Sequence, residues 1–358
     1  MESLIFYIIV FMIVFLLNII GKKFYKNNKA ISYIFIIASF TILLFLYGVR
    51  YQVGTDYKSY IEYYEIIKYT KWVNLFYLNW EKGFLIILKL YSLFIKEPRL
   101  IFFLFGFLTL FPIYKINKDY DFKYLPMSII IFCFIFLAFS FNGMRQAVAM
   151  SFVLWSFNCV FNKKNKAGII ILVISIFLHK SSIIIIPFFI LLLLNKEKPK
   201  EFQFKSFLLT ILISVLILFF LKDLLASRGI ISYSSYLNRI NTNNISYKAL
   251  LLHMPTILIV LIFHKKNNLE IMYSSFVFNG IIFEIIGTAA QYLSRIALYF
   301  TCFEIILLPV ILDNLQIKYN RVVLNILYVI YIIIYFYFQF YISGRHEIFP
   351  YQTWLPIK

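Results

Sequence analysis

The chain has 358 residues, of which 62% are hydrophobic and 14% are charged. A soluble domain is usually about 45–50% apolar, so this composition excludes an ordinary soluble protein and indicates that lipid is the main solvent. The formal net charge of +19 does not indicate nucleic-acid binding, because most lysines gather in short loops between apolar runs, as the positive-inside rule describes.

Apolar runs recur along the chain without strand-like alternation, which favours a helical bundle over an outer-membrane barrel. A helix needs about 20 apolar residues to cross a bilayer. The runs that meet this requirement are 3–20, 31–48, 100–117, 124–141, 145–161, 206–222, 249–264, 270–289, 293–312 and 322–342. The stretch 167–195 is too long for one ordinary span and has a polar break at His179, so we expect two short helices that meet there.

Residues 83–95 are also apolar, but Lys89 lies at their middle and would place a charge at the bilayer centre. We therefore expect a re-entrant or interfacial segment here. The sequence thus predicts an all-α, polytopic membrane protein with about 12 transmembrane helices in a single domain over residues 1–358. In the alternative, 83–95 crosses fully, which reverses everything after it and places four basic loops outside.

Orientation follows from the basic loops, which the positive-inside rule assigns to the cytoplasm. They are 21–29, 162–166, 196–205, 264–268 and 313–321. Both termini then lie outside, together with two long external loops, the Tyr- and Trp-rich segment 49–80 and the Ser- and Asn-rich segment 223–247. Residues 3–20 are expected to stay as a first span, because no small-residue cleavage site follows them.

Two carboxylates near predicted membrane edges are candidates for chemistry. Gly54 permits a tight turn that would fold Asp56 back toward Arg50 and orient this arginine for an oxyanion; the alternative is a surface ion pair in a juxtamembrane turn. Glu81 is a candidate base or partner for an arginine, or else a favourable acid in a first helical turn.

Two further arginines lie at predicted outer edges. Arg145 opens a helix between Asn142 and Gln146, and such a helix start with several donors forms an anion site. Arg295 is a third outer-edge arginine after Arg50 and Arg145. The alternative for both is contact with lipid head groups.

His179 is the best candidate for a general acid or base, because imidazole titrates near neutral pH; a structural helix cap is the alternative. His253, His264 and His346 are less informative. The sequence contains no P-loop, Rossmann fingerprint, serine-hydrolase elbow or HExxH motif. The external carboxylates lack metal-like spacing, and the three cysteines lie within apolar runs, so we expect neither a metal nor another cofactor.

Several short motifs occur in a fixed order and spacing along the chain. They are Arg50 with Gly54-Thr55-Asp56-Tyr57, Glu81-Lys82-Gly83, Met144-Arg145-Gln146-Ala147, His179-Lys180-Ser181 and a closing Phe349-Pro350-Tyr351. Each is weak alone, but the ordered set resembles the EpsG family of Wzy-type polysaccharide polymerases. The resemblance covers nearly the whole chain and is diffuse after about residue 200, which affects Arg295.

This resemblance implies a membrane glycosyltransferase that uses no nucleotide sugar. Such polymerases join oligosaccharide repeat units carried on undecaprenyl pyrophosphate, at the outer face of the bacterial cytoplasmic membrane, to build exopolysaccharide, capsule or O-antigen. The growing glycan leaves its lipid pyrophosphate and is transferred to a newly flipped unit. The expected partners are this lipid-linked oligosaccharide, the bilayer, a chain-length regulator and a flippase.

The residue types fit that chemistry. Arginine pairs with phosphate oxygens in a bidentate manner, so we expect Arg50, Arg145 and Arg295 to hold the pyrophosphate. The acceptor hydroxyl gains from a base, for which His179 is the first candidate, followed by Asp56 and Glu81. The candidates for glycan contacts are Tyr57, Gln146, Lys180, Tyr233 and Arg239.

Three other classes would also use cationic groups or a histidine. A transporter or flippase of the same lipid-linked oligosaccharide would place charges in both halves of a cavity, whereas the candidates here cluster at one face. A related glycan ligase differs from a polymerase only in the motif set. A membrane acyltransferase would also use a histidine.

Overall fold

The computed structural model describes residues 1–217, 248–263, 267–288, 291–315 and 318–355. Within these ranges the regular structure is helical apart from one isolated antiparallel bridge between Arg50 and Thr353. The chain divides into two compact units, Met1–Ser182 with Val323–Lys358, and Ile183–Val322. Each unit is described separately, and the single membrane domain expected from the sequence stays a prediction.

The first unit is built around long helices that pack against their neighbours in the chain. Its helices are α1 (Glu2–Phe24), α2 (Lys29–Gly48), α3 (Tyr57–Tyr69), η1 (Trp72–Tyr77), α4 (Lys82–Phe94), η2 (Pro98–Leu100), α5 (Ile101–Lys118), α6 (Leu125–Ile131), η3 (Phe132–Phe136), α7 (Leu137–Asn142), α8 (Met144–Phe161) and α9 (Asn165–Leu178). Close to its end the chain adds η7 (Tyr337–Ile342) and η8 (Arg345–Glu347).

The second unit contains α10 (Ile186–Asn195), α11 (Pro199–Val215), α14 (Lys248–Phe263), α15 (Asn268–Gly287), α16 (Gln291–Thr301) and α17 (Glu304–Asp313). Helix α15 is central in it, because it packs against α11, α14, α16 and α17. Two helices cross the boundary between the units in sequence, η4 (Lys180–Ile185) and α18 (Lys318–Phe336).

Seven helical stretches among the described residues are long and apolar enough to cross a membrane. They are Glu2–Phe24, Lys29–Gly48, Pro98–Lys118, Leu125–Asn142, Asn268–Gly287, Leu293–Asp313 and Arg321–Ile342. Each overlaps one predicted span, so the prediction of an all-α, polytopic membrane protein is confirmed. Shorter apolar helices are Asn165–Leu178, Lys180–Asn195 and Leu252–Phe263.

The predicted break at His179 is present. Helix α9 ends at Leu178 because His179 adopts an extended conformation, with φ −153° and ψ 116°. The Ser182 hydroxyl and backbone N–H both donate to the His179 carbonyl, at 2.7 and 3.1 Å. Helices α9 and α10 are therefore two short helices separated by η4, as the sequence predicted.

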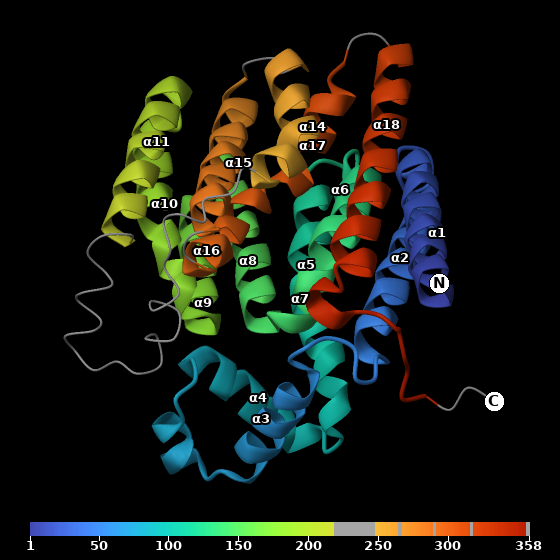
Figure 1. The fold of residues 1–358 in the computed structure, drawn as a ribbon, viewed down its shortest axis with the longest axis vertical. Coiled ribbons are helices and arrows are strands. Elements are labelled where there is room, and N and C mark those ends of the chain that lie inside the picture. Colours follow the sequence, from blue (N-terminus) through green and yellow to red (C-terminus); the bar gives the residue numbers. More distant parts are fainter. Residues whose placement is uncertain (218–247, 264–266, 289–290, 316–317, 356–358) are drawn as a thin grey trace. The chain divides into compact units, whose positions relative to one another are not determined.

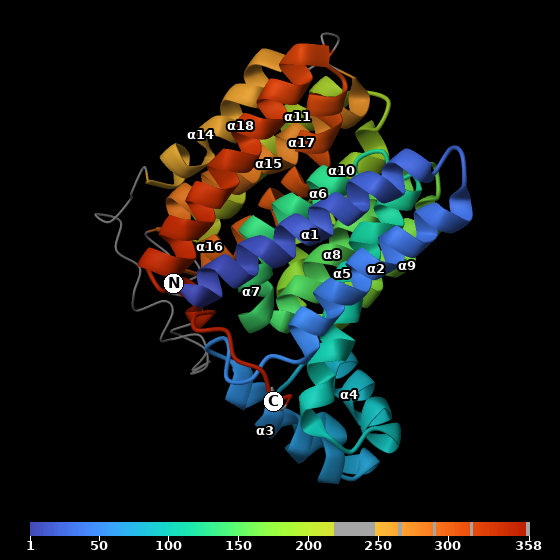
Figure 2. The same ribbon diagram turned by 90° about the vertical axis from the view of Figure 1, so that its right-hand side faces the viewer.

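Segment 49–80, expected as an external loop, contains the helices α3 and η1. Helix α3 packs against α4, and the two lie beyond the end of α2 and beside the first turns of α5 (Figures 1 and 2). Helix α4 has 13 residues, which give a length of about 20 Å against a hydrocarbon core of about 30 Å. It is shorter than this core and is absent from the seven stretches found among the described residues.

The last residues of the chain fasten the turn that follows α2. The Tyr51 N–H donates to the Gln352 carbonyl at 2.8 Å, and the Trp354 N–H donates to the Val49 carbonyl at 3.0 Å. The Gly54 N–H donates to the Glu347 carbonyl at 2.9 Å. The first and last of the ordered sequence motifs, around Arg50 and Tyr351, therefore form one substructure within the first unit.

Candidate active site

Glu81, Arg145 and His179 meet in the first unit, although 98 residues separate the first from the last. One carboxylate oxygen of Glu81, Oε1, accepts from Nδ1 of His179 at 2.8 Å. The other, Oε2, accepts from Nη1 of Arg145 in a short ion pair. Glu81 thus bridges an imidazole and a guanidinium, and we call these three residues the charged triad.

The meeting of α4 with α9 depends on Gly83. A β-carbon at this position would lie 2.5 Å from the carbonyl oxygen of Phe177 and 2.7 Å from its carbonyl carbon. Only glycine lets the first turn of α4 approach the last turn of α9 this closely. Because Glu81 immediately precedes α4 and His179 immediately follows α9, this contact places the carboxylate beside the imidazole.

Arg145 reaches the triad from the first turn of α8. Gly143 separates α7 from α8, with φ −75° and ψ 50°, so that α8 begins at Met144. The guanidinium carbon lies 5.0 Å from the centre of the Phe84 ring, in a cation–π contact. Its Nε is buried and has no hydrogen-bond partner among the described residues, so Arg145 keeps donor capacity beyond its bond to Glu81.

Electrostatics keep Glu81 ionised. Burial alone would raise the pKa of Glu81, but the hydrogen bond from His179 and the charge of Arg145 outweigh it and hold the pKa at about 2. An ionised carboxylate only accepts hydrogen bonds. The proton in the contact with His179 therefore resides on Nδ1, which in a neutral imidazole leaves Nε2 unprotonated.

Nε2 of the His179 imidazole is available to a substrate. Nε2 of His179 makes no hydrogen bond to a described residue. It is also not one of the buried polar atoms that lack a partner, so this nitrogen is accessible at the protein surface. The side chain keeps 22% of its surface exposed, against 10% for Glu81. This is the arrangement of a histidine that acts as a general base, because a carboxylate holds one ring nitrogen and the other is open to a substrate.

Aromatic residues surround the triad. Trp80 precedes Glu81 and packs against Tyr63, with ring centres 4.4 Å apart. Tyr60 is buried near Phe84; burial raises the pKa of this phenol, and the nearby charge of Arg145 partly offsets the rise. Segment 57–80 thus supplies rings beside the charged groups.

Arg50 is placed differently from the sequence prediction. Its side chain is fully buried, with the guanidinium carbon 4.4 and 4.5 Å from the ring centres of Phe102 and Phe141. Nη1 donates to the carbonyls of Val53 and Phe141, at 3.1 and 2.7 Å. Burial lowers the pKa of Arg50 to about 10, which leaves it charged at neutral pH. In this conformation Arg50 fastens the turn after α2 and does not face solvent.

The expected pairing of Asp56 with Arg50 is wrong. Asp56 is exposed at the start of α3 and accepts from the Thr55 hydroxyl at 3.2 Å. Gly54 does form the turn, with φ +96°, but the Arg50 side chain points inward to backbone carbonyls. The physical reason is that the two aromatic rings and these carbonyls offer the guanidinium a buried site.

The remaining predicted site residues are dispersed. Tyr57 is buried and stacks on Phe102, with ring centres 4.6 Å apart. Gln146 is buried in α8 and Lys180 is exposed beside His179. Arg295 is exposed on α16, in the second unit. The predicted residues Tyr233 and Arg239 lie outside the described residues.

The second unit contains a further polar cluster that the sequence patterns did not predict. Nε2 of His253 contacts Glu284 at 2.9 Å, and Nδ1 contacts Glu304 at 3.1 Å. The three residues come from α14, α15 and α17, which pack together. Ionisable residues within predicted spans are expensive and often functional, and that rule would have pointed to Glu284 and Glu304. Among the described residues, no group of His, Cys, Asp or Glu side chains is arranged to hold a metal ion.

The fold and the charged triad define an integral membrane protein with several membrane-spanning helices and a buried carboxylate that joins a histidine to an arginine. The sequence matches the EpsG family over residues 33–353, which is most of the chain, and the protein belongs to this family. Membership associates it with polysaccharide biosynthesis at a membrane. Searches of curated proteins and of solved structures gave no match.

Proposed function

We propose that this protein is a polysaccharide polymerase that joins oligosaccharide repeat units carried on undecaprenyl pyrophosphate. The observation on which the proposal depends is the bridge that Glu81 makes between His179 and Arg145. Glycosyl transfer from a lipid pyrophosphate needs a base for the acceptor hydroxyl and a cation for the leaving group. The charged triad offers one of each, oriented by a shared carboxylate.

In the proposed reaction, His179 accepts the proton of the acceptor sugar hydroxyl on Nε2. The hydroxyl oxygen then forms the new bond to the anomeric carbon of the growing glycan. Glu81 stays ionised, holds Nδ1–H and stabilises the imidazolium that forms, as the carboxylate of a serine-protease triad does. This assigns Glu81 an orienting role, and Asp56, which is exposed and outside the triad, is not required as the base.

The bond that breaks joins the anomeric carbon to the lipid pyrophosphate, and its electron pair leaves with the pyrophosphate. Arg145 stabilises this charge through the N–H groups that it does not use for Glu81. Its unpartnered buried Nε supports the presence of a further acceptor in the functional complex. Arg50 is fully buried, so its proposed part is to hold the turn after α2 rather than to contact phosphate.

The glycan and protein partners are part of the same proposal. Lys180 and Gln146 directly adjoin His179 and Arg145 in sequence, and they are proposed to contact sugar hydroxyls or phosphate. Tyr57, Tyr233, Arg239 and Arg295 remain candidates for further substrate contacts. A flippase that delivers the lipid-linked units and a chain-length regulator are the proposed protein partners, within the bacterial cytoplasmic membrane.

We also propose about 12 transmembrane helices, with both termini and the charged triad on the extracytoplasmic side. The seven candidate stretches found among the described residues support seven of these crossings, and the other crossings are proposed from the apolar runs of the sequence. The positive-inside rule assigns the basic loops to the cytoplasm, which supports this orientation. The short helix α4 then lies along the outer surface, which keeps Glu81 outside the membrane core.

The proposal is tested by incubating the purified protein in proteoliposomes with lipid-linked repeat units. A ladder of lengthening glycans is expected, with one lipid pyrophosphate released for each new bond. A glycan of unchanged repeat number on a new acceptor would instead identify a ligase, and movement of the unit across the bilayer without new bonds would identify a flippase. Glu65→Gln serves as a matched control, because Glu65 is a half-buried carboxylate of α3 that pairs only with Lys68 in the described structure.

A further inference from the structure

Helix α4 buries Phe84, Leu85 and Leu88 against the first unit, and the exposed face of its last turns is also apolar. Lys89 is buried, whereas Leu90, Leu93 and Phe94 are exposed, Phe94 by 83%. A helix on a water-facing surface carries polar residues on its exposed face. The exposed side of α4 is therefore built for an apolar environment.

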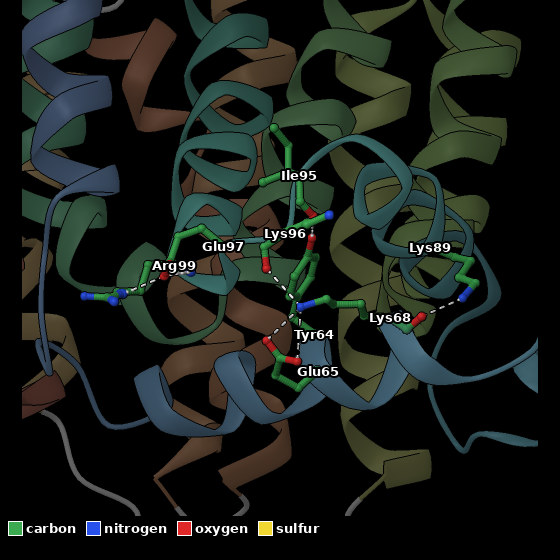
Figure 3. A network of polar contacts seen from close by, with 8 residues as sticks. All are labelled: Tyr64, Glu65, Lys68, Lys89, Ile95, Lys96, Glu97 and Arg99. Atoms are coloured by element: carbon green, nitrogen blue, oxygen red, sulfur yellow. Dashed lines mark hydrogen bonds and ion pairs between the residues drawn. The ribbon is translucent and has the colours of Figure 1, made fainter.

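A polar network compensates Lys89 and fixes this arrangement (Figure 3). Its ammonium group donates to the carbonyls of Ile67 and Lys68 at the end of α3, at 3.2 and 2.9 Å. Nearby, the Tyr64 hydroxyl donates to the Ile95 carbonyl, and Lys68 donates to the Lys96 carbonyl at 3.0 Å. These bonds hold the last turn of α3 against the last turns of α4.

Exposed apolar side chains continue from these helix ends onto η1. The largest exposed fractions belong to Val73 and Tyr77, at 83% and 82%. The full set, which we call the apolar rim, is Ile66, Tyr69, Trp72, Val73, Phe76, Tyr77, Leu90, Leu93 and Phe94. Two lysines accompany it, since Lys68 lies 5.1 Å from the Tyr69 ring centre and Lys82 lies 5.9 Å from that of Phe76.

We propose that the apolar rim is embedded in the head-group region of the outer leaflet and anchors α3, η1 and α4 to the membrane surface. Tryptophan and tyrosine are enriched at this depth, with lysine beside them, and the aliphatic residues reach toward the acyl chains. The short connections to candidate spans support this location. Residues 95–97 separate α4 from the stretch Pro98–Lys118, and residues 49–56 separate α3 from α2.

A glycan platform is the competing occupant of the same surface. Sugars stack on flat aromatic rings and bind through polar groups around them, whereas Ile66, Val73, Leu90 and Leu93 offer neither. The aliphatic share of the apolar rim therefore favours lipid. Anchoring would also fix the depth of Glu81, which immediately precedes α4, but the proposal does not depend on the chemistry of the charged triad.

The proposal is tested with spin labels on the full-length protein in nanodiscs that hold one copy each. Labels are placed at Val73→Cys and Phe94→Cys in the apolar rim and at the exposed Lys58→Cys on α3 as the water-facing control. The native cysteines are buried, and protein without an added cysteine gives the background. The collision rate of each label is measured with oxygen, which partitions into lipid, and separately with a water-soluble nickel chelate.

We expect the labels at positions 73 and 94 to be relaxed mainly by oxygen, with collision rates for the nickel chelate at least about tenfold lower than at position 58. Equal nickel access at all three positions would overturn the proposal. Protection at positions 73 and 94 that develops only after lipid-linked oligosaccharide is added would also overturn it and would assign the surface to glycan.

Discussion

Replacing Glu81 with glutamine tests whether one carboxylate serves both His179 and Arg145. The ionised carboxylate accepts a hydrogen bond from each partner. An amide has one acceptor oxygen and one donor nitrogen, so in Glu81→Gln one of the two partners must face an N–H group. If that partner is His179, the imidazole must accept on Nδ1, which places its proton on Nε2 and removes the proposed base.

The magnitude follows from the surroundings of the carboxylate. The pKa of Glu81 is about 2 against an ordinary value of 4.5, and each pKa unit corresponds to about 1.4 kcal/mol, so the site favours the charged form by about 3 kcal/mol. We expect Glu81→Gln to lose up to this amount of folding stability. Loss of an oriented base lowers turnover by about 10²–10⁴-fold.

Initial rates of glycan elongation on lipid-linked repeat units provide the assay, with thermal unfolding in detergent as the measure of folding. Glu65→Gln, the matched control on α3, should keep its rate within about twofold, since a partly exposed ion pair at 3.5 Å contributes little. A folded Glu81→Gln protein that elongates glycan at nearly the wild-type rate would refute the bridging role of Glu81.

Further predictions concern the framework and its pH dependence. Gly83→Ala should destabilise the first unit by about 1–3 kcal/mol and slow elongation, because its β-carbon meets the Phe177 backbone; an unchanged unfolding temperature would contradict this. Arg50→Met should lower stability by about 3 kcal/mol through loss of its buried hydrogen bonds, whereas Arg99→Met, at a partly exposed ion pair, should change it by less than about 1 kcal/mol. The folded state depresses the pKa of Glu81, so its contribution is complete above the unfolded pKa near 4.5 and is lost as the pH falls toward 2. The difference in unfolding temperature between wild type and Glu81→Gln should therefore be constant from pH 8 to about 5 and shrink below that, as scanning fluorimetry can measure.

Features governed by the cost of charge in lipid could be predicted from the sequence. The position of Lys89 in an apolar run predicted a segment that does not cross. Helix α4, with 13 residues, is shorter than the hydrocarbon core, and its place at the membrane surface stays a prediction. The polar residues at His179 indicated a break between two short helices, which η4 supplies. In both cases the free-energy cost of a charged or polar group in lipid decides the local structure.

Features governed by side-chain direction could not be predicted. Turn geometry placed Arg50 near Asp56, but the buried site of Arg50 is made by Phe102 and Phe141, which come from distant helices. The bridge at Glu81 depends on the close approach of α4 to α9 at Gly83, and no spacing in the sequence encodes it. The contacts of His253 likewise depend on the rotation of three helices about their axes.

The most direct test of the charged triad counts lipid pyrophosphate released against glycosidic bonds formed, in purified wild-type protein and in His179→Gln. Our account predicts one release per bond in the wild type, and a decrease of both by at least about 100-fold in a folded His179→Gln protein. Equal counts in the two proteins would show that the imidazole does not accept the acceptor proton, and would contradict the account.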